Sequence, residues 1–208
     1  MSDDKNAEAG AKAAGCSDCG RRNLIAATAV VGGAAGIGAA VPFALSFTPS
    51  ERAKAAGAPV EADISALKPG EKMVVEWRGK PVWIIRRTPE MLASLKATDP
   101  LLADPDSKRS EQPEYVKGDA RAIKPEYLVC IGICTHLGCS PSDKLAPGAE
   151  GGMGSEWHGG FLCPCHGSQF DLSGRVLKSM PAPDNLPIPP HKYLSDSKIL
   201  IGEDSKGA

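Results

Sequence analysis

No charged side chain occurs between residues 23 and 50, and this stretch most constrains what the chain can fold into. A helix rises 1.5 Å per residue, so roughly 20 apolar residues cross the hydrocarbon core of a membrane. We therefore expect a transmembrane anchor helix at 23–47. A buried helix of a soluble protein and a cleaved secretory signal are the alternatives. The bulky ending Phe43 to Phe47 argues against cleavage, which needs small residues.

A pair of arginines precedes the uncharged stretch and bears on its orientation. Arg21 and Arg22 stand directly before Asn23-Leu24-Ile25, and this pattern resembles a twin-arginine export signal. The alternative is a plain basic flank of a membrane helix. The resemblance predicts that 1–22 form a cytoplasmic N-terminus. It also predicts a single-pass protein of a bacterial inner membrane, with the rest of the chain on the periplasmic side.

The charge balance excludes one class of partner. The chain has 24 Lys and Arg against 25 Asp and Glu, and the two signs are mixed along the sequence. A nucleic-acid-binding protein would show a basic tract or stripe, so we expect no nucleic acid partner.

After the anchor, the pattern changes to a short connector and then to β-strands. We expect a flexible tether at 48–62 and a head domain at 63–208. Two β-rich runs within 73–87 flank a turn at Arg78-Gly79-Lys80-Pro81 and predict a hairpin. Further strands are expected at 127–133, 161–163, 175–177, 193–194 and 198–202, and a short helix at 89–95. The fold class is therefore all-β, with antiparallel sheets.

Two clusters of cysteine and histidine carry the chemistry of the head. The first reads C-T-H-L-G-C at 134–139, and the second reads C-P-C-H-G-S at 163–168. Together they offer two thiolates and two imidazoles, a donor set that suits zinc or an iron–sulfur cluster. The ligands of a C-x-H pair are too close in sequence to lie one helical turn apart. Tight loops must therefore present them, as Gly138 and Gly167 would permit.

These two motifs closely resemble the signature boxes of the Rieske iron–sulfur subunit of bacterial cytochrome bc complexes. The resemblance implies a Rieske fold of antiparallel sheets with a cluster-binding subdomain at about 130–182. It also implies a Rieske-type [2Fe–2S] cluster, in which two histidines replace two cysteines on one iron. Carried over by position, Cys134 and Cys163 would hold one iron, and His136 and His166 the other.

The resemblance implies roles for other residues of the two boxes. Cys139 and Cys165 would form a disulfide that joins the loops, and the Ser168 hydroxyl would donate to a bridging sulfide. Leu137, Gly138 and Pro181 would belong to the surface that meets the quinol site and the cytochrome.

The function that the resemblance implies is electron transfer in a quinol–cytochrome c reductase. A membrane quinol would give one electron to the cluster and a proton to the imidazole of His166. The head would then swing on its tether and pass the electron to a c-type cytochrome. The expected partners are cytochrome b and c-type cytochrome subunits, within a dimeric, proton-translocating complex.

Two departures and two alternatives accompany this interpretation. The segment 140–162 is longer than in mitochondrial members, which suggests a bacterial surface insertion, and Phe170 stands where many members carry tyrosine.

The first alternative is the Rieske subunit of an arsenite oxidase, which shares the boxes and the export signal. The second is a structural zinc-binding module, which would use the same two cysteines and two histidines.

The remaining candidate residues have ordinary explanations. We expect Cys16 and Cys19 to be reduced cytoplasmic thiols, because no second ligand pair lies near them. Cys130 lies in an apolar run and is expected in the core. Other residues with expected structural places are Trp77 and Trp83, in the core, and His158 and His191, on the surface.

Overall fold

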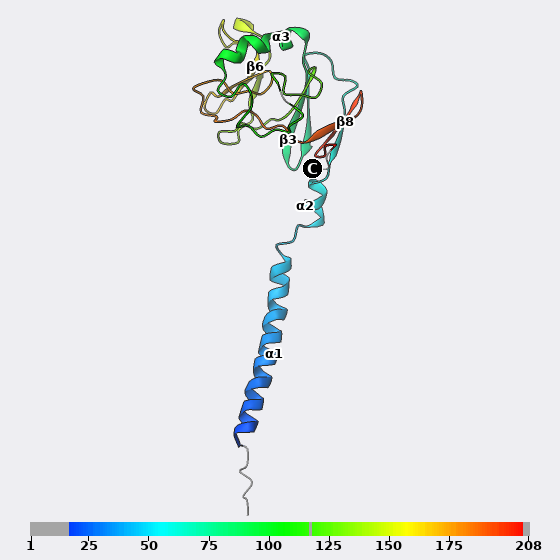
Figure 1. The fold of residues 1–208 in the computed structure, drawn as a ribbon, viewed down its shortest axis with the longest axis vertical. Helices are drawn as coiled ribbons and strands as arrows, with labels where there is room; N and C mark the ends of the chain where they lie inside the picture. The colour runs from blue at the N-terminus through cyan, green and yellow to red at the C-terminus, as the bar shows by residue number, and fades with distance from the viewer. Residues whose placement is uncertain (1–16, 117, 206–208) are drawn as a thin grey trace, which may run out of the picture. The chain divides into compact units, whose positions relative to one another are not determined.

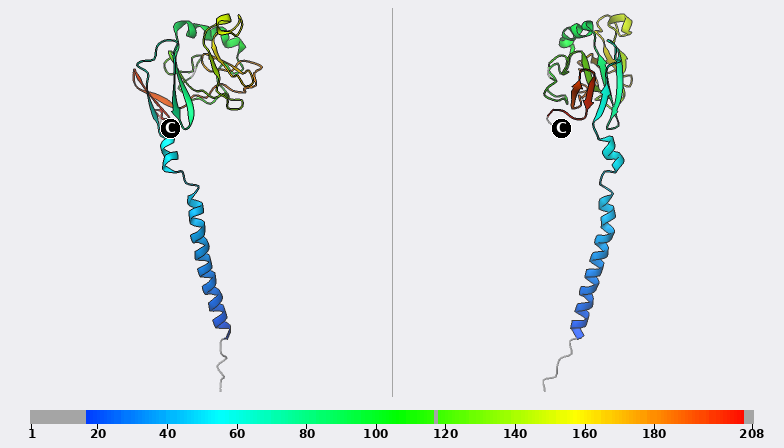
Figure 2. Two further views of the ribbon diagram at one scale, coloured as in Figure 1. Left: turned by 180° about the vertical axis from the view of Figure 1, so that it is seen from behind. Right: turned by 90° about the vertical axis from the view of Figure 1, so that its right-hand side faces the viewer.

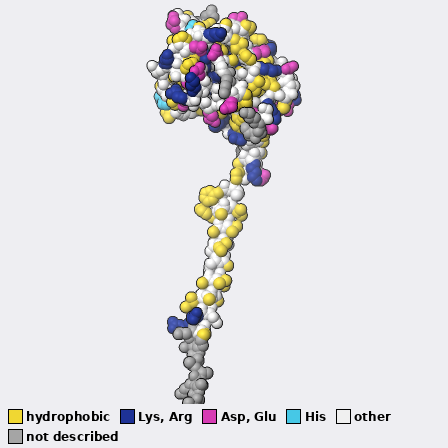
Figure 3. Space-filling view, in the orientation of Figure 1, with side chains coloured by type: hydrophobic (Ala, Val, Ile, Leu, Met, Phe, Trp, Pro, Cys, Tyr) yellow, Lys and Arg dark blue, Asp and Glu magenta, His cyan; other side chains and the backbone are white. Residues whose placement is uncertain are grey.

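The computed structural model describes residues 17–116 and 118–205, which belong to two units, Met1–Ser50 and Glu51–Ala208. The described part of the first unit contains α1 (Ser17–Leu45) (Figure 1). Within this helix, Cys19–Leu45 is long and apolar enough to cross a membrane. Its apolar side chains are exposed, and Figure 3 shows them covering the helix surface. The helix expected at 23–47 is present, and it begins earlier, so that it includes Arg21 and Arg22.

The described residues of the second unit, 51–116 and 118–205, form three antiparallel sheets of three strands each. Its helices α2 and α3 lie at opposite ends of the unit (Figures 1 and 2). The sheet orders are β1-β9-β8, β2-β3-β4 and β5-β6-β7. In chain order, the elements are α2 (Glu51–Ala56), β1 (Val60–Asp63), β2 (Lys72–Trp77), β3 (Lys80–Arg86), α3 (Pro89–Thr98), η1 (Asp99–Leu101), β4 (Tyr127–Ile131), β5 (Ser142–Lys144), η2 (Gly148–Gly151), β6 (Gly160–Leu162), β7 (Gln169–Asp171), β8 (His191–Ser195) and β9 (Lys198–Ile201).

The β2-β3-β4 sheet is covered on both faces, and this explains the continuous apolar runs in β3 and β4. Residues 82–85 and 127–131 are all buried. Along β3, Trp83 and Ile85 pack into one apolar core, while Val82 and Ile84 pack into a second. This alternation follows the period of two residues at which strand side chains change face. The first core includes Phe161 and Phe170 of the β5-β6-β7 sheet, and the second includes Ile199 and Ile201 of β9.

The hairpin between β2 and β3 turns at Arg78 and Gly79, as the sequence predicts. Both residues have positive φ, 53° and 71°. Positive φ at both central residues is the geometry that matches the twist of a two-residue hairpin. The expected short helix is also present as α3, which Thr88 caps by accepting the backbone N–H of Met91 at 3.3 Å.

Three expectations about secondary structure need correction. The tether expected at 48–62 contains α2, and its last three residues belong to β1. The strand expected at 175–177 is absent, because only single bridges form there, Phe170 with Val176 and Leu102 with Leu177. The strands β1, β5 and β7 were not expected. β5 and β7 have only three residues each, too few to show a sequence period.

Candidate metal centre

The first Cys/His segment begins where β4 ends and forms a closed turn. The backbone N–H of Cys134 donates to the Cys139 carbonyl at 2.8 Å, and that of Gly138 donates to the Cys134 carbonyl at 3.1 Å. Gly138 has φ of 83°, a conformation that a side chain would strain. Before the turn, a Cβ on Gly132 would lie 2.0 Å from the Trp83 ring. The entry to the loop therefore requires glycine.

The second segment lies between β6 and β7 and repeats the same turn. The N–H of Cys163 donates to the Ser168 carbonyl at 2.8 Å, and that of Gly167 donates to the Cys163 carbonyl at 2.9 Å. Gly167 has φ of 77°. The two Cys/His loops are thus equivalent in their backbone hydrogen bonds, and each carries its first cysteine at the base of the turn.

A disulfide joins the two loops, as expected. Cys139 and Cys165 are bonded at an S–S distance of 2.05 Å. The Sγ atom of Cys163 lies within 4.8 Å of both disulfide sulfurs. Cys134 and Cys163 are free thiols with exposed fractions of 3% and 2%. Burial raises the pKa of the Cys134 thiol, which also hydrogen-bonds Cys163. Two buried thiols are therefore left unbridged beside the disulfide.

The two histidines of the motifs face each other across the loops. The ring centroids of His136 and His166 are 4.7 Å apart, and the rings are nearly perpendicular. The Nδ1 atom of His136 is buried and has no hydrogen-bond partner among the described residues. His166, in contrast, is exposed. A buried imidazole nitrogen without a partner is costly unless a further group binds it.

The proline-rich segment 181–187 closes the site on a third side. Ser168 is fully buried, and its Oγ atom accepts the backbone N–H of Ala182 at 3.0 Å. Thr135, within the first loop, donates its hydroxyl to the Asp184 carbonyl at 2.6 Å. Each Cys/His loop is therefore hydrogen-bonded to this segment.

The expected docking residues are on the surface. Leu137 is 70% exposed. Gly138 and Pro181 are exposed as well.

Among the other candidates, two expectations were wrong. His191 is buried, with 2% exposed, because its Nδ1 atom contacts the Pro189 carbonyl at 2.9 Å. Cys19 is disulfide-bonded rather than reduced, and Cys16 lies outside the described residues. The core positions of Trp77, Trp83 and Cys130 are confirmed, and burial raises the pKa of Cys130 to about 12.

Sequence reasoning missed the buried arginines, which hold the segments beneath the site. Arg87, Arg121 and Arg175 have exposed fractions of 1% or less. Surface positions are the usual choice for arginine, so the residue type alone does not indicate burial. Most of their partners come from distant segments, and only the Arg175–Asp171 pair is local in sequence.

Comparisons with known proteins agree with the geometry. The family model of the Rieske [2Fe-2S] domain matches residues 103–190. The ubiquinol-cytochrome c reductase iron-sulfur subunit of Allochromatium vinosum is 60% identical over 188 residues, covering 90% of each chain. The subunit of the same name from Bradyrhizobium diazoefficiens is 42% identical over 177 residues, covering 85% of this chain and 88% of the relative. A solved structure described as hyperthermophilic respiratory Complex III matches at 26% identity with a TM-score of 0.44, over 85% of this chain and 98% of that chain.

Proposed function

Because the chain belongs to the family of Rieske iron–sulfur subunits of ubiquinol–cytochrome c reductase, we propose that it carries electrons from a membrane quinol to a c-type cytochrome. The arsenite oxidase alternative is not favoured, since both relatives described above are named as ubiquinol–cytochrome c reductase subunits. The observation that carries the proposal is the pair of buried thiols beside the facing imidazoles of His136 and His166.

The residues of the two loops fit a [2Fe–2S] cluster. Two adjacent buried thiols offer soft sulfur, and the unpartnered Nδ1 of His136 offers a nitrogen that needs a partner. We assign Cys134 and Cys163 to one iron and His136 and His166 to the other. When bound, such a cluster accepts and releases one electron, at a potential raised by its histidine ligands.

The exposure of the two histidines indicates which of them can meet the quinol. His166 is the exposed histidine of the pair, so its imidazole is the group that a quinol hydroxyl can reach. The imidazole accepts the quinol hydrogen bond and then the proton, and His166 is in this sense the catalytic residue. Leu137 and Gly138 in the first loop, together with Pro181 of the proline-rich segment, form the surface that docks at the quinol site and at the cytochrome.

The supporting groups act on the ligand loops. The Cys139–Cys165 disulfide holds the loops together over the site. Ser168 carries a fully buried hydroxyl in the second loop, and donors of this kind stabilise the more negative, reduced state.

The first unit serves as the membrane anchor. The resemblance of Arg21 and Arg22 to a twin-arginine signal supports an exported orientation, with the head on the periplasmic side of the inner membrane. Within 48–62, the residues outside α2 and β1 act as the tether that lets the head move between cytochrome b and a c-type cytochrome subunit. We further propose that the chain is a catalytic subunit of a dimeric complex.

Electron paramagnetic resonance of the reduced, purified chain tests the proposal. A [2Fe–2S] cluster with two histidine ligands gives a spectrum at low average g, whereas zinc gives none. A coloured protein with that spectrum, which also oxidises quinol within its complex, is the expected result. A colourless protein that binds zinc would overturn the proposal in favour of the structural zinc-binding module.

A further inference from the structure

Three buried arginines converge on the turn that follows β7, at 171–175. Arg175 is neutralised, because its Nε is 2.8 Å from Asp171 and its Nη1 is 2.7 Å from Asp99. Arg87 and Arg121 form no ion pair within the described part of the chain and donate to carbonyls and neutral side chains. Burial lowers the pKa of both to about 10, so both remain charged at neutral pH. A buried cation of this kind is costly to displace from its hydrogen bonds.

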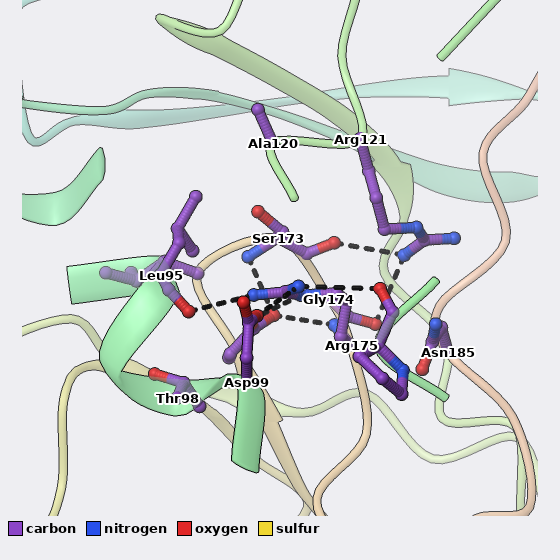
Figure 4. Close-up of polar contacts among 12 residues, drawn as sticks. Leu95, Thr98, Asp99, Ala120, Arg121, Ser173, Gly174, Arg175 and Asn185 are labelled. Carbon is purple, nitrogen blue, oxygen red and sulfur yellow. Dashed lines mark hydrogen bonds and ion pairs between the residues drawn. The ribbon is translucent and has the colours of Figure 1, made fainter. Parts of the chain in front are cut away.

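Arg121 connects two segments that are distant in sequence. Its Nη1 donates to the Ser173 and Gly174 carbonyls at 3.0 and 3.3 Å, and its Nη2 donates to the Leu186 carbonyl at 2.9 Å. Figure 4 shows its guanidinium directed at the Ser173–Gly174 turn. The Leu186 N–H donates to the Gly174 carbonyl at 2.8 Å. The proline-rich segment is therefore fixed at its end, Leu186, to the turn that follows β7.

The same segment contacts the site four residues earlier. Ala182 donates its N–H to the Ser168 Oγ atom at 3.0 Å. Since this bond occupies one lone pair of the hydroxyl, the hydroxyl hydrogen is free to point elsewhere. Ser168 is fully buried, and its carbonyl accepts the N–H of Cys163 at 2.8 Å, so under the proposed function the hydroxyl hydrogen is directed at the cluster that this loop holds. A shift of Ala182 would turn the hydroxyl away from the site.

We propose that Arg121 is a positioning residue for electron transfer: by holding Leu186 it keeps Ala182 on Ser168, and so directs the Ser168 hydroxyl at the cluster. The inference rests on the proposed function, because it concerns the potential of a bound cluster. The residues that connect Arg121 to the site are closely packed, since Leu186, Ala182 and Cys134 belong to one buried apolar core. Small displacements are transmitted in such close-packed interiors.

Arg87 supplies a matched control. It is equally buried and charged and also contacts the turn, through the Leu172 carbonyl at 3.2 Å and the Ser173 hydroxyl at 2.8 Å. Its other bonds go to the Ala120 and Pro125 carbonyls, and it makes none to the proline-rich segment. Replacing either arginine with lysine keeps the charge and removes the fork of donors. Both variants therefore lose hydrogen bonds from a buried guanidinium to the turn at 171–175. Only Arg121→Lys also loses the hydrogen bond to the Leu186 carbonyl.

The test is a redox titration of the full-length chain, followed by the spectrum of the cluster, together with thermal unfolding. Arg121→Lys should lower the midpoint potential, because a donor to the reduced state is lost, while Arg87→Lys should leave it unchanged at a similar loss of melting temperature. In a Ser168→Ala background, Arg121→Lys should have no further effect on the potential. An unchanged potential in Arg121→Lys, or an equal fall in that background, would overturn the inference.

A second variant covers the case in which Arg121→Lys does not fold. Gln112→Ala removes the acceptor of the Arg121 Nε donor, 2.7 Å away, and a longer 3.4 Å bond from the Gln112 amide to the Val116 carbonyl, and should lower the potential by a smaller amount. An unchanged potential in Gln112→Ala would then count against the inference. A wild-type chain without the iron–sulfur spectrum would contradict the proposed function itself, which separates the two failures.

Discussion

The imidazole rings of His136 and His166 meet edge to face with centroids 4.7 Å apart, although they come from separate loops, one between β4 and β5 and the other between β6 and β7. The pair is asymmetric, since His166 is exposed and His136 has a buried Nδ1 atom. The imidazole of His166 is therefore more open to a partner in solution than the half-buried imidazole of His136.

Loss of the exposed imidazole should remove both the cluster and the activity. His166→Ala deletes one of four proposed ligands, so we expect no iron–sulfur spectrum and at least a hundredfold loss of quinol oxidation, about 2.7 kcal/mol in the barrier. His158→Ala is the control, because His158 belongs to the 140–162 segment outside the two motifs. A normal spectrum in His166→Ala would exclude this residue as a ligand.

Removing the disulfide should destabilise the second unit. Cys139 and Cys165 are separated by 26 positions, and closing a loop of this size restricts the unfolded chain by about 3.5 kcal/mol. The Cys139→Ser/Cys165→Ser double variant should lose about this free energy of unfolding, measured in urea by tryptophan fluorescence. Reductant should weaken the wild type by a similar amount and leave the double variant unaffected. If reductant weakened both proteins equally, the loss would have another origin.

A tyrosine at position 170 should raise the midpoint potential. Phe170 is fully buried in β7 and stands opposite Phe161 of β6. A hydroxyl there needs a hydrogen-bond partner, and a ligand sulfur would gain a donor that favours the reduced state. Redox titration of Phe170→Tyr measures the effect, with Phe161→Tyr as a control for adding a hydroxyl to the same core. A potential that stays constant or falls in Phe170→Tyr contradicts this expectation.

The parts of the fold that could be predicted from sequence are those with local signals. The uncharged run predicts α1, and the alternating runs around Arg78-Gly79 predict the hairpin, because strand period and turn residues act over a few positions. β5 and β7 escaped detection, since three residues of pairing depend on the neighbouring strand β6 rather than on their own sequence.

The site residues also fall into those that local motifs indicate and those that depend on contacts between distant segments. Its cysteines and histidines lie in two short motifs, so their types and spacing indicate a metal centre. The residues that support these loops are scattered: Arg121 contacts Leu186, which is 65 positions away. The backbone of the buried His191 likewise exchanges hydrogen bonds with the hydroxyl of Tyr115, 76 positions away. Burial of a single polar residue depends on tertiary packing, and one sequence contains no record of it.

Acid should weaken the second unit through Asp104. Burial alone would raise its pKa, but hydrogen bonds from the N–H groups of Lys108 and Arg109 and from the Ser110 hydroxyl hold it below its ordinary value. A lowered pKa in the folded state means that the unfolded chain binds the proton more readily. The resulting stability is present above the ordinary aspartate pKa of about 4 and is lost as the pH falls through the lower folded value.

The measurement is urea unfolding of Asp104→Asn and wild type from pH 7 downward. Asp104→Asn should cost on the order of 1–2 kcal/mol at pH 7, and its difference from wild type should shrink in acid. Asp106→Asn is the control, because that carboxylate pairs with Lys108 on the surface. A difference between Asp104→Asn and wild type that stayed constant with pH would contradict the role of this carboxylate.

The tether should matter for turnover and not for the cluster. Residues 57–59 join α2 to β1, and Pro59 already stands there. Gly57→Pro/Ala58→Pro would make three consecutive prolines, which adopt a stiff, extended conformation. We expect quinol oxidation by the complex to fall at least tenfold, while the spectrum and midpoint potential of the cluster stay as in wild type. A Gly57→Ser/Ala58→Ser variant of equal length keeps the segment flexible and should turn over normally. Wild-type turnover with the proline run would show that the head need not move on this segment.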